Sequence, residues 1–169
     1  SEIVEAELNN NADMRSLAPR VSRVFFYGAG SSSPEMCSVI EKGLKKVMPL
    51  AEISVGHDLE GAAFSTWSGT SAINWILGTG SNSCYFDGDK VYEEVPSLAY
   101  ILGDEGSGSW FGKRLLQAFF YKQLPREMHD DFVSVFNLSV TDVTRKTYTE
   151  PNPNVFLASF MKFIAKHKD

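Results

Sequence analysis

The chain has 169 residues, of which 43% are hydrophobic and 22% charged, and these are ordinary values for a globular protein. Its formal net charge is −5 and its lysines and arginines form no run, so we expect no nucleic-acid partner. No segment has the apolar length needed to span a bilayer, and residues 1–5 do not resemble a signal peptide. We therefore expect a cytoplasmic protein with no membrane partner.

The first part of the chain alternates helices and strands. The pattern predicts a helix over 2–17, a strand over 23–27, a helix over 34–47 capped by Ser33, a strand over 52–55, and another helix after Asp58. The first strand contains three consecutive apolar residues, so we expect it to be buried on both faces. Strand, helix, strand and helix in this order indicate an α/β lobe with a parallel pair of strands.

The second part changes character near residue 73. It predicts strands over 73–77, 83–86 and 90–93, with a hairpin turn at Asp87-Gly88-Asp89 between the last two. Helices are predicted over 110–121, 125–136, 140–148 and 154–166. We therefore expect two lobes, residues 1–72 and residues 73–169. Aromatic residues at helical spacing are expected in the core: Phe119, Phe120, Tyr121, Phe156, Phe160 and Phe163.

Cysteine and histidine give no sign of a metal centre. Cys37 and Cys84 are the only cysteines, and neither stands in a ligand-spaced pattern, so we expect neither a disulfide framework nor a structural zinc site. The histidines are not at ligand spacing either. His129 and His167 lie on charged helices, and we expect them to be solvated surface residues.

Residues 78–81, Gly78-Thr79-Gly80-Ser81, form the first candidate site, a tight turn between two strands. Two glycines let the backbone approach an anion closely, and the hydroxyl groups supply further donors. No Gly-Lys-Ser/Thr follows, so this is not a Walker A loop. An ordinary glycine-rich hairpin turn is the alternative.

Two acidic positions complete the candidate chemistry. Asp58 follows the second predicted strand, where a carboxylate can act as a general base in phosphoryl transfer or can cap the next helix. Asp104 and Glu105 stand in the loop Gly103-Asp104-Glu105-Gly106-Ser107-Gly108. Adjacent carboxylates there suit vicinal sugar hydroxyls, but they could also hold a metal or cap the following helix.

The order of these motifs resembles a known family. His57-Asp58-Leu59, the stretch 76–84 and the loop 102–108 resemble the N-acetylglucosamine kinase-like family, which has a BadF/BadG-type ATPase domain and belongs to the sugar kinase, actin and heat-shock ATPase superfamily. Residues 27–30 and 153–160 extend the resemblance over nearly the whole chain. It implies an α/β, ribonuclease H-like actin/sugar-kinase fold, with part of the N-terminal lobe and the start of the C-terminal lobe.

The resemblance also implies a reaction and residue roles. The reaction is ATP-dependent phosphorylation of an amino sugar, most simply N-acetylglucosamine at its 6-hydroxyl, with Mg²⁺ accompanying ATP; a homodimer would fit the family. Asp58 resembles the catalytic base. The residues that resemble the phosphate-binding turn are Gly78, Thr79, Gly80 and Ser81, and those on the sugar side are Asn82, Asp104 and Glu105.

The sequence also departs from the family. The first phosphate-binding hairpin, with its magnesium-associated acidic residue, and the C-terminal adenosine motif are absent, so we expect a central fragment that does not turn over ATP alone. Ala99 stands where the family usually has glycine, and we expect the local backbone to differ there. Two alternatives stay open: an ATPase activator of a radical dehydratase or reductase, and a non-catalytic hexosamine-binding sensor.

Overall fold

The structure, a computed structural model, describes residues 6, 10–31 and 33–168. Residues 1–5, which were expected not to be a signal peptide, lie outside these described residues, as does most of the first half of the helix expected over 2–17. The described chain is mixed α/β, as expected, and no helix in it is long and apolar enough to cross a membrane.

The chain divides into two compact units. Unit 1 comprises residues 1–74 and 84–92, and unit 2 comprises residues 75–83 and 93–169. The units are therefore discontinuous along the sequence, because residues 84–92 pack with the first unit. The expected boundary between residues 72 and 73 stays a prediction.

Unit 1 contains the predicted parallel pair of strands. Its elements are α2 (Ala12–Leu17), the 3-10 helix η1 (Ala18–Arg20), β1 (Arg23–Gly28), α3 (Pro34–Val47), β2 (Glu52–His57) and α4 (Asp58–Thr66). β1 and β2 run parallel, with Arg23 opposite Glu52 and Gly28 opposite His57. Ser33 caps α3, and Pro34 stands in its first turn, so the predicted helix start is confirmed.

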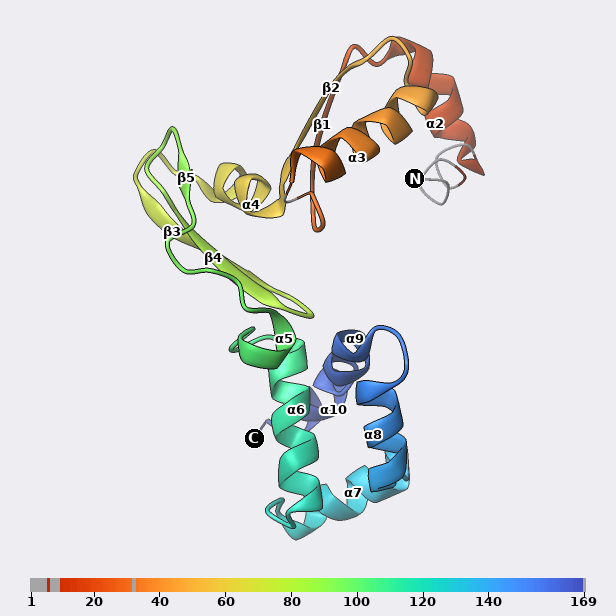
Figure 1. Ribbon diagram of the computed structural model, residues 1–169, viewed down its shortest axis with the longest axis vertical. Coiled ribbons are helices and arrows are strands. Elements are labelled where there is room, and N and C mark those ends of the chain that lie inside the picture. The colour runs from red at the N-terminus through yellow and green to blue at the C-terminus, as the bar shows by residue number, and fades with distance from the viewer. Residues whose placement is uncertain (1–5, 7–9, 32, 169) are drawn as a thin grey trace. The chain divides into compact units, whose positions relative to one another are not determined.

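The core of unit 1 lies between α3 and one face of the strands, and α3 runs alongside β1 and β2 (Figure 1). The buried residues of this core are Ala18, Leu44, Met48 and Ala51. Val24 and Phe26 of β1 pack against them, whereas Phe25 between them is 62% exposed. Burial of β1 on both faces was therefore a wrong prediction for the described chain. On the other face, Tyr27 packs edge-to-face against Phe64 of α4 at the end of the strand.

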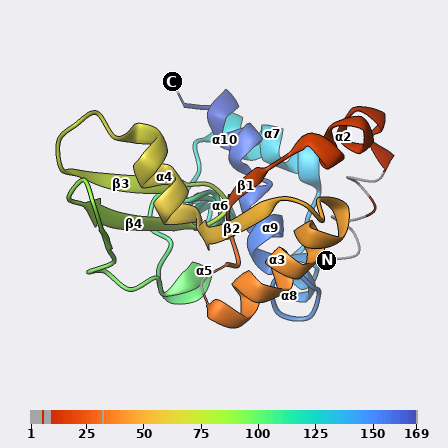
Figure 2. The ribbon, with the colours of Figure 1, turned by 90° about the horizontal axis from the view of Figure 1, so that it is seen from above.

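A three-stranded sheet follows, with the order β3 (Ala72–Leu77), β4 (Ser81–Phe86) and β5 (Val91–Tyr92). Figures 1 and 2 both show β3 and β4 side by side. The three predicted strands are thus confirmed. Asp87 closes the second turn, because its Oδ1 accepts hydrogen bonds from the amides of Asp89 and Lys90. The Lys90 amide, followed by that of Asp89, lowers the pKa of Asp87 below its ordinary value.

The helices of unit 2 are α5 (Ala99–Leu102), α6 (Gly108–Phe120), α7 (Arg126–Phe136), α8 (Val140–Tyr148), α9 (Pro153–Ala158) and α10 (Met161–Lys166). The single helix predicted over 154–166 is therefore two helices. The Ser159 hydroxyl donates to the carbonyl of Phe156, and such local bonds compete with the regular helical ladder. The break coincides with Phe160, which is almost completely buried.

Leucine and phenylalanine side chains form the core of unit 2, whose buried members are Leu115, Leu116, Phe132, Leu157, Phe160 and Phe163. The prediction that Phe160 and Phe163 are core residues is confirmed. Tyr121 is 70% exposed, so its expected burial is wrong; it is the C-cap residue of α6 and lies just beyond the last turn of the helix.

His167 also departs from expectation. Its side chain is only 18% exposed, and its Nε2 lies 2.7 Å from Oδ2 of Asp131 on α7, where Lys166 Nζ also donates at 2.9 Å. His129 is more exposed but stacks on Phe119. The prediction of two solvated histidines was therefore wrong for His167.

α6 and α9 approach each other closely at two glycines. A Cβ atom built on Gly112 would lie 1.9 Å from the carbonyl oxygen of Leu157, and one built on Gly108 would lie 3.0 Å from Cβ of Ala158. No side chain fits at Gly112 unless the helices separate, so this glycine sets their distance.

Candidate functional site

The hairpin turn (residues 78–81) joins β3 to β4. The Gly78 amide donates to the carbonyl of Gly80 at 2.9 Å. Within the described chain, the amides of Thr79 and Gly80 have no acceptor, and Thr79 is exposed. Two consecutive backbone donors are thus available to an anionic ligand.

The N-terminus of α6 supports this turn. The amides of Gly108 and Ser109 donate to the carbonyls of Gly78 and Thr79 at 2.8 and 3.0 Å. Ser107 is the N-cap of the helix, and its hydroxyl accepts a hydrogen bond from the amide of Trp110 at 3.2 Å. These helix amides are therefore used inside the protein and fix the turn. Because Ser107 holds the cap, the alternative capping role for the preceding carboxylates is wrong.

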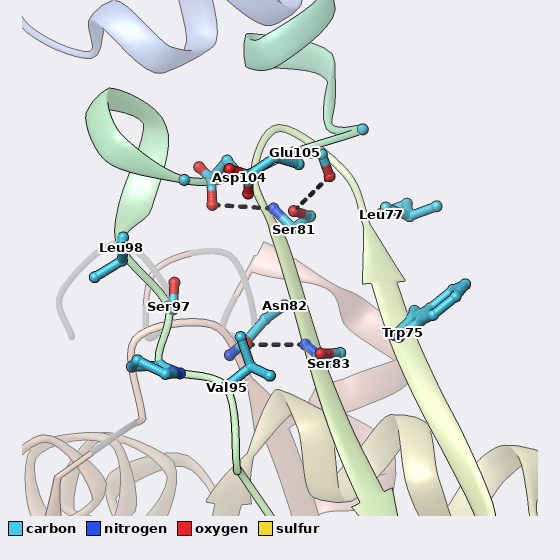
Figure 3. A pocket seen from close by; sticks show the side chains of 13 residues that line it. Trp75, Leu77, Ser81, Asn82, Ser83, Val95, Ser97, Leu98, Asp104 and Glu105 are labelled. Carbon is cyan, nitrogen blue, oxygen red and sulfur yellow. Dashed lines mark hydrogen bonds between the residues drawn. The ribbon is translucent and has the colours of Figure 1, made fainter.

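Asp104 reaches the hairpin turn with its carboxylate. Its Oδ1 accepts a hydrogen bond from the Ser81 amide at 3.2 Å, and the Ser81 hydroxyl donates to the carbonyl of Glu105 at 3.0 Å (Figure 3). A Cβ atom on Gly80 would lie 2.8 Å from Asp104 Oδ2. Glycine at position 80 thus leaves the space that the carboxylate occupies.

A cavity of about 530 Å³ opens beside these groups, wholly within unit 2. It is lined by Trp75, Leu77, Ser81, Asn82, Ser83, Val95, Pro96, Ser97, Leu98, Gly103, Asp104, Glu105 and Gly106 (Figure 3). Asn82 Oδ1 accepts from the Ser83 amide at 2.8 Å, and its side-chain nitrogen has no acceptor among the described residues. The volume and the mixture of apolar walls with a few polar groups suit a small polar molecule.

The structure therefore brings together the predicted residues of the turn and of the acidic loop. Sequence reasoning missed the apolar walls of the cavity. Trp75 and Leu77 are two residues apart on β3, so strand alternation could have placed both on one face beside the turn. Val95 and Leu98 lie in an irregular segment, and no pattern in the sequence marks them.

Ala99 follows this segment with a φ of 55°, in the left-handed region. Glycine occupies that region without strain, whereas an L-residue with a Cβ atom is disfavoured there. Alanine thus adopts at this position a conformation typical of glycine. Asp104 is also left-handed, with a φ of 59°, but aspartate tolerates this conformation better than most residues.

Asp58 belongs to unit 1, where it is the first residue of α4. The cap of this helix is His57, so the alternative role of Asp58 as helix cap is wrong. Asp58 Oδ1 accepts the Leu59 amide at 2.9 Å, and Oδ2 has no donor among the described residues. His57 Nδ1 lies 3.2 Å from the same Oδ1, and the Asp58 side chain is 29% exposed.

No group of three or more histidine, cysteine, aspartate or glutamate side chains in the described chain is arranged to hold a metal ion. The Cys37 and Cys84 thiols lie in unit 1, where they contact the backbone carbonyls of Ser31 and Leu59.

No protein-family model matches the chain, and no curated protein matches its sequence. Among solved structures, the chain is similar to a crystal structure from Porphyromonas gingivalis that bears the provisional name N-acetylglucosamine kinase. The TM-score is 0.88 and the sequence identity 35%, over 97% of this chain and 59% of that protein. The chain is thus similar to a sugar kinase. It spans 59% of the length of that relative, and the expected likeness to N-acetylglucosamine kinases is confirmed at this level.

Proposed function

We propose that this protein is an ATP-dependent kinase of an amino sugar, with N-acetylglucosamine as substrate and the 6-hydroxyl as acceptor. The observation that carries the proposal is the contact of Asp104 with Ser81, which joins a sugar-sized cavity to a turn with free amides. Similarity to a structure named as a kinase of this sugar supports it. We also propose membership of the N-acetylglucosamine kinase-like family and its ribonuclease H-like fold.

In this proposal the hairpin turn binds the phosphates of ATP. The amides of Thr79 and Gly80 and the hydroxyl of Thr79 are donors that an anionic oxygen can engage without displacing a protein acceptor. Phosphoryl transfer depends mostly on positioning and on neutralising charge at the transferred group. Mg²⁺ would accompany ATP, but the described residues contain no cluster of acidic side chains that fits the ion.

The cavity of unit 2 binds the sugar. The remaining lone pairs of Asp104 accept from vicinal hydroxyls, and the side-chain nitrogen of Asn82 donates to a ring substituent. Trp75 and Leu77 offer an apolar wall to the C–H groups of the sugar. Glu105 lines the same cavity and is placed on the sugar side.

Asp58 supplies the base. Its free Oδ2 accepts the proton of the 6-hydroxyl as that oxygen bonds to the γ-phosphorus, while the bond between the phosphorus and the β,γ-bridging oxygen breaks and ADP leaves. General-base help of this kind contributes about 10²–10⁴-fold to the rate.

The test is ADP release by the full protein expressed from its gene, with N-acetylglucosamine, glucosamine and glucose as acceptors. We expect N-acetylglucosamine to give the highest kcat/KM. Asp58→Asn should lower kcat by about 10²–10⁴-fold while sugar affinity, measured by calorimetry, stays close to wild type. Asp89→Asn, in the exposed second turn of the sheet, serves as the matched control. ADP release that no sugar stimulates would contradict the kinase proposal.

An activator ATPase of a radical enzyme would need cysteines at an iron–sulfur cluster, and the backbone contacts of the Cys37 and Cys84 thiols do not favour it. A sugar-binding sensor remains an outcome of the same assay, in which N-acetylglucosamine binds but ADP is not released.

A further inference from the structure

The β1 turn (residues 28–31, Gly28-Ala29-Gly30-Ser31) ends in a buried hydroxyl. Ser31 is only 3% exposed, and its Oγ lies 2.5 Å from the carbonyl oxygen of Gly28 and 2.6 Å from that of Gly56. A serine hydroxyl has one proton, so it donates to one of these carbonyls at a time. Gly28 ends β1, and Gly56 is the penultimate residue of β2. One side chain therefore joins the carboxyl ends of the two parallel strands.

The backbone that Ser31 holds leads directly into Asp58, two residues after Gly56. Other contacts fix the same segment. A Cβ atom on Gly56 would lie 2.7 Å from the ring of Tyr27, so this ring covers the strand end closely. The amide of His57 donates to Oε2 of Glu60 at 3.0 Å. The direction in which Asp58 leaves the strand is thus set by neighbours on β1, in the β1 turn and on α4.

We propose that Ser31 is a positioning residue for Asp58, an inference that rests on the proposed function of Asp58 as the catalytic base. Ser31 acts through the Gly56 carbonyl and not by contact with a reacting group. A base must lie within hydrogen-bond reach of the proton it accepts, and a misplacement of about 1 Å can cost about 10²-fold in rate. Loss of the Ser31 hydroxyl removes the side-chain group that joins the carbonyls of Gly28 and Gly56, which allows the strand end to move.

Ser33 provides a matched control in the same connection. Its hydroxyl accepts the Met36 amide and caps α3, so it supports the start of that helix and not the strand ends. Ser33→Ala should therefore lower the melting temperature and leave kcat close to wild type. If Ser31 contributed only to stability, Ser31→Ala would also lower the melting temperature and leave kcat close to wild type.

The experiment measures kcat and KM of the full protein for ATP and N-acetylglucosamine. Ser31→Ala should lower kcat by about 10- to 100-fold with both KM values little changed, and Ser31→Thr, which keeps the hydroxyl, should recover most of the loss. In the folded protein the Leu59 amide donates a hydrogen bond to the Asp58 carboxylate. Hydrogen exchange at this amide should be faster in Ser31→Ala than in Ser33→Ala.

The outcomes separate this inference from the proposed function. If the wild-type protein shows no sugar-dependent ADP release, the kinase proposal fails and the role of Ser31 in it fails as well. If the wild type is active and Ser31→Ala keeps its kcat, the positioning role alone is overturned. Should Ser31→Ala not fold, Ser31→Cys takes its place, because a thiol is a weaker donor; a wild-type kcat in that variant also overturns the inference.

Discussion

The β1 turn and the hairpin turn share the pattern Gly-x-Gly-Ser, and each directly follows a β-strand. In both, the serine hydroxyl lies within hydrogen-bonding distance of a carbonyl far along the chain, that of Gly56 in one case and that of Glu105 in the other. The β1 turn is closed on itself around the buried Ser31. The hairpin turn keeps the amides of Thr79 and Gly80 without an acceptor in the described chain, and the β1 turn likewise keeps those of Ala29 and Gly30. The two turns differ in their serines, because Ser31 is buried and Ser81 is half-buried.

The difference arises from what surrounds each turn. The β1 turn leads into α3 beside a parallel neighbour, so its serine faces the end of β2. The hairpin turn leads into an adjacent strand, and amides at the start of α6 donate to the carbonyls of Gly78 and Thr79. A Gly-x-Gly-Ser pattern alone therefore does not fix the burial of its serine or the partners of its carbonyls; the neighbouring elements determine both.

The largest expected effect is on the stability of α6, the helix whose first amides support the hairpin turn. Gly112→Ala would place a methyl group 1.9 Å from the Leu157 carbonyl, a backbone atom that cannot rotate away. We expect unit 2 to lose about 3 kcal/mol or more of its free energy of unfolding, because overpacking forces α6 and α9 apart. Urea denaturation checks this, with Gln117→Ala on the exposed side of α6 as control. Equal stability of the two variants would refute the close-packing argument.

The glycines inside the two turns give the next effect. In Gly80→Ala the new methyl group meets the Asp104 carboxylate, the end of a side chain that can rotate. Stability should change little, whereas the Kd for N-acetylglucosamine should rise about tenfold or more, since about 1.4 kcal/mol of binding corresponds to that factor. Calorimetric titration measures the Kd.

Gly30→Ala is the matched change in the β1 turn. A Cβ atom there meets nothing within 4 Å, but the φ of Gly30 is 87°. We expect a loss of about 1–2 kcal/mol in stability from backbone strain, with sugar affinity unchanged. If Gly30→Ala weakened sugar binding as much as Gly80→Ala, the distinction between the two turns would be lost.

A substitution at Ala99 should have a smaller effect, and it should raise the free energy of unfolding where Gly112→Ala and Gly30→Ala lower it. Ala99→Gly removes the strain of a left-handed alanine and adds backbone entropy to the unfolded chain, so these terms partly cancel. We expect a gain of up to about 1 kcal/mol in the free energy of unfolding. Denaturation with Ala118→Gly, inside α6, as control should show a loss there and no loss at position 99.

The smallest effect is a pH dependence in unit 2. The hydrogen bond from Lys166, followed by that from His167, lowers the pKa of Asp131 below its ordinary value of 3.8. A lowered pKa in the folded state means that the contribution to stability is present above pH 3.8 and is lost as the pH falls through the folded-state pKa. Asp131→Asn should flatten the acid limb of the stability profile. Asp130→Asn, the more exposed neighbour, should leave it as in the wild type.

Much of the fold could be predicted from local signals. The Ser33-Pro34 cap and the Asp87 turn carry their own geometry, and the structure confirms both. The break at Ser159 could not be predicted, since it depends on the burial of Phe160 in a core formed by other helices. The exposure of Phe25 depends on which face of β1 a helix covers, which periodicity does not encode.

In the candidate site, too, local motifs could be predicted from the sequence, whereas contacts between distant segments could not. The motifs of the hairpin turn and the acidic loop marked residues that the structure brings together, such as Ser81 and Asp104. The assigned roles of these residues and of Asp58 stay predictions. The partner of His167, 36 residues away on α7, and the apolar walls at Val95 and Leu98 required the tertiary fold.

The carboxylate of Asp104 has a thermodynamic consequence. The same group lines the cavity and accepts the amide of Ser81, next to the free amide of Gly80. A ligand that orders this carboxylate from the cavity side also orders the hairpin turn, and an anion that orders the turn also orders the carboxylate. Linkage requires the two effects to be equal: whatever factor one ligand contributes to the affinity of the other, it receives in return. Under the proposed function, the hydrogen bond between Asp104 and Ser81 thus couples sugar binding to phosphate binding.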